Sequence, residues 1–135
     1  MLGYIMIGAD DMAGAVRFWS AVLPPLGYAP NRGEGYVVYS RAGGGEGAPM
    51  IYVIKPFDGG PASAGNGSMT AFAAPTQAMV RQLHAAGLAA GGTDEGAPGF
   101  REAYSDSFYV GYLRDPQGNK LAVYCADPAE GRRGG

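Results

Sequence analysis

Few residues of this chain are suited to chemistry, and tyrosine is the most abundant of them. The 135 residues include nine tyrosines but only one histidine, His84, and one cysteine, Cys125. Tyrosine rings stack on planar molecules while their hydroxyls fix orientation, so tyrosines that line one hollow would suit a small aromatic ligand. The alternative is that they serve as good strand formers, some at a subunit interface. The candidates for lining a hollow are Tyr4, Tyr52, Tyr104, Tyr109, Tyr112 and Tyr124.

His84 and Cys125 are weak candidates for catalysis. His84 falls in the middle of a predicted helix without a second histidine at metal-ligand spacing, so we interpret it as a partly buried or surface residue. A catalytic cysteine needs a nearby cation to stabilise its thiolate. Alternation along the last predicted strand instead directs Cys125 away from Ala122 and Tyr124, and we interpret it as a buried, inert thiol.

Arg101 is the charged residue best suited to ligand binding. It lies with Glu102 in a predicted loop over residues 99–107, beside Tyr104. A guanidinium next to aromatic rings can hold an anionic group through a pair of hydrogen bonds. The alternative is a solvated loop charge without functional consequence.

Composition limits the class of protein. A chain of 135 residues with 47% hydrophobic residues predicts one globular domain over residues 1–135. The net charge of −2 gives no basic surface, which argues against nucleic acid and anionic membranes as partners. A single cysteine cannot form an internal disulfide and no signal-peptide pattern is present, so we expect a cytoplasmic protein. From Ala129 onward we expect a flexible tail.

Apolar periodicity predicts the secondary structure. Two helices with apolar stripes are expected, the first ended by Pro24-Pro25 and the second by Gly91-Gly92. A glycine-rich loop is expected over residues 41–48, and a second loop from Asp94 to Tyr104. An extended segment begins at Gly27, and the predicted strands cover residues 2–8, 34–40, 50–54, 68–74, 107–114 and 120–125.

The two halves of the chain repeat the same order of elements. At one offset, Gly3 matches Gly67 and Val16-Arg17 matches Val80-Arg81. A strand–helix–strands unit that occurs twice indicates an internal duplication, with repeats at about 1–58 and 66–127. Two paired β-α-β-β-β modules predict an α+β fold, in which a curved, mostly antiparallel sheet carries the helices on its convex face. Its concave face, the cup, is where we expect a ligand.

The closing hairpin carries the most specific motif. Asp115-Pro116 opens a tight turn because proline fixes φ there, and Gly118-Asn119 tolerates positive φ. Together with the duplication, this hairpin resembles the glyoxalase / bleomycin-resistance / extradiol-dioxygenase superfamily, the vicinal-oxygen-chelate fold. The segment over residues 89–99 is similar to a loop of a glyoxalase-like subgroup. The resemblance extends along most of the chain and implies the paired-module fold and a homodimer.

The same resemblance implies a divalent metal that acts as a Lewis acid, held by His and Glu on the inner strands. Carried onto this chain, three of the ligand positions fall on Tyr4, Met69 and Ala122, and the fourth falls near Ile51 or Tyr52. These residues are not normal ligands for a hard or borderline divalent ion. We therefore expect no metal cofactor, unless the ligand positions are displaced.

Three functions stay open at the level of sequence. The favoured hypothesis is a metal-independent protein that binds a small molecule, aromatic in the simplest case, in the cup. The second is a lyase or dioxygenase that uses a divalent metal through atypical ligands. The third is an interaction module whose cup is filled by its own side chains. For the favoured hypothesis no catalytic residue is assigned, and the predicted cup residues are Tyr4, Tyr52, Met69, Arg101, Tyr104, Tyr109, Ala122 and Tyr124.

Overall fold

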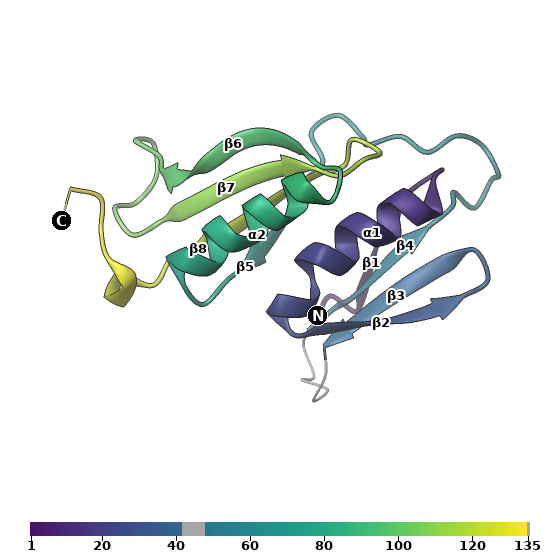
Figure 1. Ribbon diagram of the computed structural model, residues 1–135, viewed down its shortest axis with the longest axis horizontal. Coiled ribbons are helices and arrows are strands. Elements are labelled where there is room, and N and C mark those ends of the chain that lie inside the picture. The colour runs from purple at the N-terminus through teal and green to yellow at the C-terminus, as the bar shows by residue number, and fades with distance from the viewer. Residues whose placement is uncertain (42–47, 135) are drawn as a thin grey trace.

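The computed structural model describes residues 1–41 and 48–134, and the glycine-rich loop expected over 41–48 therefore falls almost wholly outside the described residues (Figure 1). The first half contains β1 (Tyr4–Gly8), α1 (Met12–Val22), η1 (Pro24–Leu26), β2 (Tyr28–Gly33), β3 (Tyr36–Arg41) and β4 (Met50–Ile54). The second half contains β5 (Thr70–Ala73), α2 (Gln77–Ala89), β6 (Thr93–Phe100), β7 (Tyr109–Arg114), β8 (Lys120–Cys125) and η2 (Pro128–Glu130).

The strands form two four-stranded sheets with matching topology. Sheet A has the order β1-β4-β3-β2 and sheet B the order β5-β8-β7-β6. The pairs β1–β4 and β5–β8 are parallel, and all other neighbouring strands pair antiparallel. The α+β class and the mostly antiparallel pairing are confirmed. The paired modules are confirmed as well: each contributes one four-stranded sheet, and the described strands show no pairing between the two sheets.

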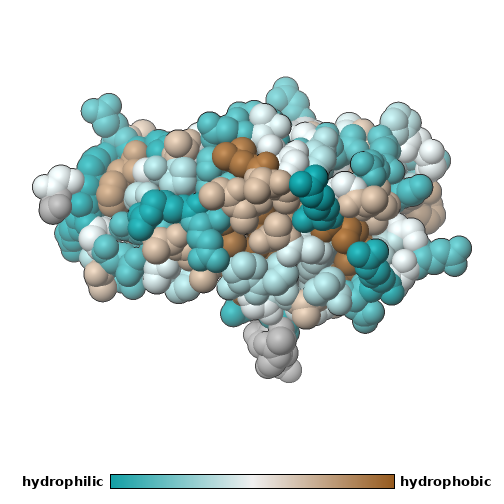
Figure 2. All heavy atoms as spheres, in the orientation of Figure 1, coloured by the Kyte–Doolittle hydropathy of each residue, from teal (hydrophilic) through white to brown (hydrophobic). Residues whose placement is uncertain are grey.

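Both helices lie side by side on one face of the sheets (Figure 1). Each begins at a capping residue: Asp11 accepts a hydrogen bond from the Gly14 backbone N–H at 3.1 Å, and Thr76 accepts one from Met79 at 3.0 Å. Hydrophobic residues form only small patches among hydrophilic ones on this helix-covered face (Figure 2). Neither helix of the described chain has the length and apolar character to cross a membrane.

Strand β6 corrects the loop predicted from Asp94 to Tyr104. Its sequence contains Gly96, Pro98 and Gly99, which are poor strand formers, and its pairing with β7 shifts register on either side of Gly96. Pro98 is tolerated because β6 is an edge strand, where one side of the backbone needs no partner. The turn-forming residues of this segment therefore led to the prediction of a loop where the structure has an edge strand.

The closing hairpin joins the two halves of the molecule. Asp115 is only 2% exposed, and its carboxylate accepts hydrogen bonds from Trp19 Nε1 at 3.0 Å and from the backbone N–H of Gln117 and Asn119. The Asn119 side chain donates to the Gly8 carbonyl at 2.9 Å. The turn thus fastens α1 and β1 of the first half to β7 and β8 of the second.

The C-terminal segment contacts the second half of the chain. The Glu130 carboxylate accepts a hydrogen bond from the Gln77 backbone N–H at the start of α2, at 2.7 Å. Arg133 donates to the Asp106 carboxylate at 2.8 Å and to the Arg101 carbonyl at 2.7 Å. These contacts describe one arrangement of the tail, and its flexibility stays a prediction.

Candidate functional site

Strand alternation assigns each side chain either to the helix-covered face or to the opposite, open face of its sheet. In β1, Ile7 is buried under α1, while Tyr4 and Met6 are 56% and 59% exposed. Residues directly paired across strands share a face, so the registers extend the assignment to every strand. We call the large side chains Tyr4, Met6, Tyr36, Met50 and Tyr52 open face A, which Val38 and Ile54 share. We call the set Met69, Ala71, Tyr112, Arg114, Lys120, Ala122 and Tyr124 open face B; Val110 lies on the same side but is fully buried.

Open face A is an uncharged aromatic surface. The ring of Tyr52 packs edge-on against Tyr4 at a centroid distance of 5.4 Å and lies 5.8 Å from Tyr36. The Tyr36 ring lies across Gly33, where a Cβ atom would have no room. All five side chains of the set are tyrosine or methionine, the residue types that are enriched at protein interfaces.

Open face B carries a run of three aromatic rings, which we call the aromatic shelf. Tyr124 stacks on Phe108 with centroids 5.2 Å apart, and Phe108 contacts Tyr104 edge-on at 5.3 Å. Ala122 lies beside them, 2% exposed, with Tyr112 and Ala71 as its cross-strand partners. Phe108 was missed at the level of sequence because the candidate rings were all tyrosines; the predicted strand over 107–114 begins at Tyr109 in the structure, so Phe108 lies just before it.

Two cations approach the ring of Tyr112. The Arg101 guanidinium carbon lies 5.6 Å from the ring centroid and the Lys120 ammonium 5.2 Å. Arg101 also donates to the Ala97 carbonyl at 2.7 Å, which holds its side chain against β6. Burial and the neighbouring Tyr104 hydroxyl raise the pKa of Tyr112 above its ordinary value. Lys120 was not among the predicted residues, although it alternates with Ala122 and Tyr124.

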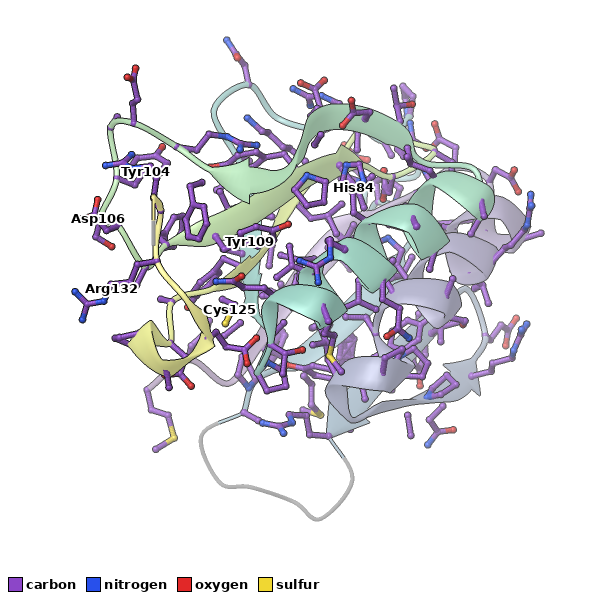
Figure 3. All side chains as sticks on the ribbon, turned by 60° about the vertical axis from the view of Figure 1, so that its left-hand side comes forward. His84, Tyr104, Asp106, Tyr109, Cys125 and Arg132 are labelled. Atoms are coloured by element: carbon purple, nitrogen blue, oxygen red, sulfur yellow. The ribbon has the colours of Figure 1, made fainter. Side chains whose placement is uncertain are left out.

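Tyr109 lies apart from the other predicted cup residues. It pairs with Cys125 across the β7–β8 ladder and therefore faces α2, where it is 8% exposed (Figure 3). Its hydroxyl accepts a hydrogen bond from Arg81 at 3.3 Å, and the Arg81 guanidinium also lies over its ring. Cys125 is buried on the same side, beneath the start of α2.

His84 also belongs to the helix-covered side. It projects from α2 towards β6 and β7, is 7% exposed, and its Nε2 lies 3.0 Å from Asp94 Oδ1 and 3.2 Å from the Tyr112 carbonyl (Figure 3). A hydrogen bond from the Gly96 backbone N–H lowers the pKa of Asp94, and His84 lowers it further. This arrangement ties α2 to β6 and does not reach the open face.

The donor set at the metal positions implied by the resemblance does not fit a divalent metal. Of the two residues expected near the fourth position, Ile51 is 1% exposed beneath α1, whereas Tyr52 lies beside Tyr4 on open face A. Two phenols, the thioether of Met69 and the methyl group of Ala122 supply no ordinary ligand. In the part of the chain that the structure describes, no three His, Cys, Asp or Glu side chains gather to hold an ion.

A separate groove of about 1000 Å³ lies between β5 and sheet A. Its lining includes Leu26, Ile51 and Phe72, and the backbone of β5 runs along it. Of the predicted cup residues, only Met69 contributes to this lining. The groove is therefore distinct from the aromatic shelf.

Solved structures with the same fold are numerous. A glyoxalase/bleomycin resistance protein from Albidiferax ferrireducens T118 is 34% identical, with a TM-score of 0.81 over 94% of this chain and 99% of that chain. A glyoxalase-related enzyme from Fulvimarina pelagi is 20% identical over 95% of this chain and 88% of that chain, with a TM-score of 0.72. A lactoylglutathione lyase from Agrobacterium tumefaciens is 20% identical over 93% and 92%, with a TM-score of 0.59.

The similarity to the Albidiferax protein spans nearly the whole of both chains, so this chain belongs to the glyoxalase/bleomycin resistance family. The other two structures, at 20% identity, support the fold alone. A scan against protein-family models finds no match for the chain, and a search of curated proteins finds none. The superfamily resemblance inferred from the closing hairpin is thereby confirmed.

Proposed function

We propose that this protein binds a small aromatic molecule on open face B without a metal ion. The observation that carries the proposal is the aromatic shelf, whose rings lie next to the hydroxyl of Tyr112. Aromatic side chains offer large apolar contact area to a planar ligand, while one or two polar groups fix its orientation. This combination favours recognition of a ring over general apolar binding.

The chemistry of the lining favours open face B over the groove beside β5. Among the described residues that line the groove, Arg41 alone is charged, and most of the others are small or aliphatic. Open face B presents ring faces, hydroxyls and cations together. Open face B thus supplies partners for both the ring and the polar substituent of a small aromatic ligand.

The residues present favour binding without the metal chemistry of the wider superfamily. Tyr4, Met69 and Ala122 occupy positions that the resemblance gives to metal ligands, and none is an ordinary ligand for a divalent ion. We accordingly assign no catalytic residue. The contribution of this chain's own residues is to bind and orient a ring.

We further propose that the protein is a homodimer in the cytoplasm. Large uncharged side chains are exposed across open face A, including Tyr4, Met6 and Met50 at 56%, 59% and 37%. A second copy that covers this face would remove an apolar surface from water and deepen the open faces into a cup. The one cysteine, Cys125, is buried as a free thiol, which suits a reducing compartment.

Thermal unfolding in the presence of naphthalene compounds tests the binding proposal. 2-Naphthoate or its neutral analogue 2-naphthamide should raise the melting temperature of the wild-type protein, because a ligand that binds only the native state stabilises it. Tyr104→Ala removes an exposed ring of the shelf and should reduce the shift, while Phe57→Ala removes an exposed ring far from the shelf and should not. The proposal fails if neither compound shifts the transition, or if both variants respond alike.

A further inference from the structure

We propose that the ligand of open face B is an anion, a planar aromatic carboxylate whose acidic group lies beside Tyr112 and its two neighbouring cations, Arg101 and Lys120. This inference rests on the proposed function, since it names the class of ligand for the same face. It assigns a role to Lys120, which the sequence did not single out.

The two cations approach Tyr112 from opposite neighbours of its strand. Strand β7 lies between β6 and β8 in sheet B, and Arg101 directly follows β6 while Lys120 begins β8. Their charged groups lie 5.6 and 5.2 Å from the same ring centroid. Two positive charges beside one phenol ring create a local positive potential on this face, which favours a negative group there.

The two carboxylates of β6 are engaged with other partners. Glu95 is held by Arg114, with its carboxylate oxygen 2.6 Å from the arginine Nε. The charge of Arg101 helps to lower the pKa of Asp94, but the Asp94 carboxylate makes its hydrogen bonds with the Gly96 backbone N–H and with His84 on the helix-covered side. Within the described chain, no ion pair includes Arg101 or Lys120.

The side chain of Arg101 is held in place by backbone carbonyls but keeps N–H groups that can bind a ligand. Its side chain donates to the carbonyls of Ala97 at 2.7 Å and Phe100 at 3.2 Å, which fixes the guanidinium against β6. A guanidinium has further N–H groups beyond these two, and they can bind a carboxylate. A fixed arginine loses less conformational entropy when it binds than a freely rotating one.

The neighbouring rings define the rest of the ligand. The Tyr112 hydroxyl lies beside that of Tyr104, and burial together with this neighbour raises the pKa of the Tyr112 phenol. Phenol O–H groups at this place can donate a hydrogen bond to an anion. The aromatic shelf continues along the same face from Tyr124 to Tyr104. An acidic group at the cations therefore leaves an attached ring next to the shelf, which is the arrangement of an aromatic carboxylate.

Calorimetric titration of 2-naphthoate and 2-naphthamide tests the inference, because the two probes share a ring system and differ in charge. The wild-type protein should bind the carboxylate about tenfold more tightly or better, as expected for a charge-assisted hydrogen bond. Lys120→Met should remove most of that preference while leaving the affinity for 2-naphthamide within about twofold. The matched control is Lys55→Met, the only other lysine of the chain, which should behave as wild type.

The outcomes separate this inference from the function on which it rests. Equal binding of both probes would overturn the anion and leave the aromatic site intact. Binding of neither probe would overturn both. Equal losses in Lys120→Met and Lys55→Met would show a general charge effect and overturn the assigned role. If Lys120→Met does not fold, two other measurements test the inference. Arg101→Gln should weaken the preference for 2-naphthoate over 2-naphthamide, and the preference of the wild-type protein should fall as the salt concentration rises, because salt screens the attraction between the carboxylate and the cations.

Discussion

His84 and Asp94 form the one ion-pair contact between α2 and β6, among the described residues, through a separation of 3.0 Å between Nε2 and Oδ1. The Asp94 carboxylate also accepts from the Gly96 backbone N–H at 2.9 Å, where the pairing of β6 changes register. These hydrogen bonds favour the charged carboxylate, which is why the pKa of Asp94 falls below its usual range. The residue therefore stabilises an irregular part of an edge strand.

The lowered pKa of Asp94 predicts an acid-sensitive contribution to stability. A carboxyl group whose pKa is lower in the folded state stabilises the fold above its unfolded pKa of about 4, and this stabilisation disappears as the pH falls through the folded pKa. Asp94→Asn should therefore lower stability at pH 7 and show a weaker decline towards pH 2. Chemical unfolding across this pH range measures it, with Asp58→Asn as a loop control. Parallel pH profiles for wild type and Asp94→Asn would contradict the account.

At the residue scale, alternation explains which site residues the sequence could predict. Ala122 and Tyr124 were correctly placed on one face of β8, because they are two positions apart. Tyr109 and Tyr112 were both considered for the cup, yet residues three apart in a strand face opposite sides, and Tyr109 packs under α2. The approach of Arg101 to Tyr112 depends on the register shifts of β6, which no periodicity encodes.

The connection from α2 to β6 depends on two adjacent glycines for different reasons. Gly91 has a φ of 100°, a conformation that other residues rarely adopt, but a Cβ atom there would meet only ordinary contacts. Gly92 has no such φ, but its Cβ would lie 2.8 Å from the Gly87 carbonyl oxygen and 3.0 Å from that of Arg114. Close backbone packing therefore requires the second glycine.

Substitution of these glycines should give unequal losses. Gly92→Ala forces a methyl group against backbone atoms that cannot rotate away, and should lower the free energy of unfolding by about 3 kcal/mol. Gly91→Ala carries mainly the strain of the left-handed conformation, about 1 kcal/mol. Denaturant unfolding measures both, and Gly91→Asn should lose less than Gly91→Ala. A larger loss for Gly91→Ala than for Gly92→Ala would contradict the packing argument.

At the element scale, the sequence predicted strongly periodic segments best. The predicted strand over 50–54 coincides with β4, and the apolar stripe that begins at Met12 coincides with α1. These elements bury regular apolar faces, so their periodicity is visible. Strand β6 was missed because its glycines, proline and acidic residues are typical of turns. Its strand conformation comes from pairing with β7 and not from the local preference of its residues.

The two halves of the whole molecule are held together by a buried polar contact as well as by apolar packing. Trp19 from α1 donates to Asp115 in the closing turn, and the Trp19 ring also lies 6.0 Å from Phe72 of β5. Trp19 is 1% exposed and Asp115 is 2% exposed. The contact spans 96 positions of sequence, so its loss should weaken the association of the halves.

Removal of the Asp115 carboxylate should destabilise the whole domain. Asp115→Ala leaves the buried Trp19 N–H and the backbone donors of the turn without an acceptor, at a cost of about 3 kcal/mol in unfolding free energy. The matched control is Asp127→Ala, which removes only the cap of a short surface turn and should cost under about 1 kcal/mol. Both are measured by denaturant unfolding. Similar losses in the two variants would contradict the role of Asp115.

A charge on open face A should disrupt the proposed dimer. Met6→Lys places an ammonium group in the middle of an uncharged surface, so covering it with a second copy would cost desolvation energy. Sedimentation of the variant should show monomer at concentrations at which wild type is dimeric. Phe57→Lys, an exposed apolar position in the linker, should stay dimeric. A monomeric wild-type protein, or a dimer in all three, would contradict the proposed interface.

At the scale of the molecule, the duplicated order of elements could be predicted from the sequence, whereas the placement of the halves could not. The repeat Gly3/Gly67 and its neighbours indicated two units of the same kind, which the two sheets display. That the strands separate into two sheets, with a groove beside β5, depends on packing between distant segments such as Trp19 and Phe72. Local periodicity carries no information about such contacts.

The most direct test of a metal-independent aromatic site is the affinity of chelator-treated protein for 2-naphthoate, compared with the same protein incubated with Ni²⁺. The residues that the resemblance places at the superfamily's metal positions, Tyr4, Met69 and Ala122, predict affinities that agree within about twofold, together with metal well below one ion per chain by mass spectrometry. Binding that is lost on chelation and restored by one equivalent of metal would contradict the account.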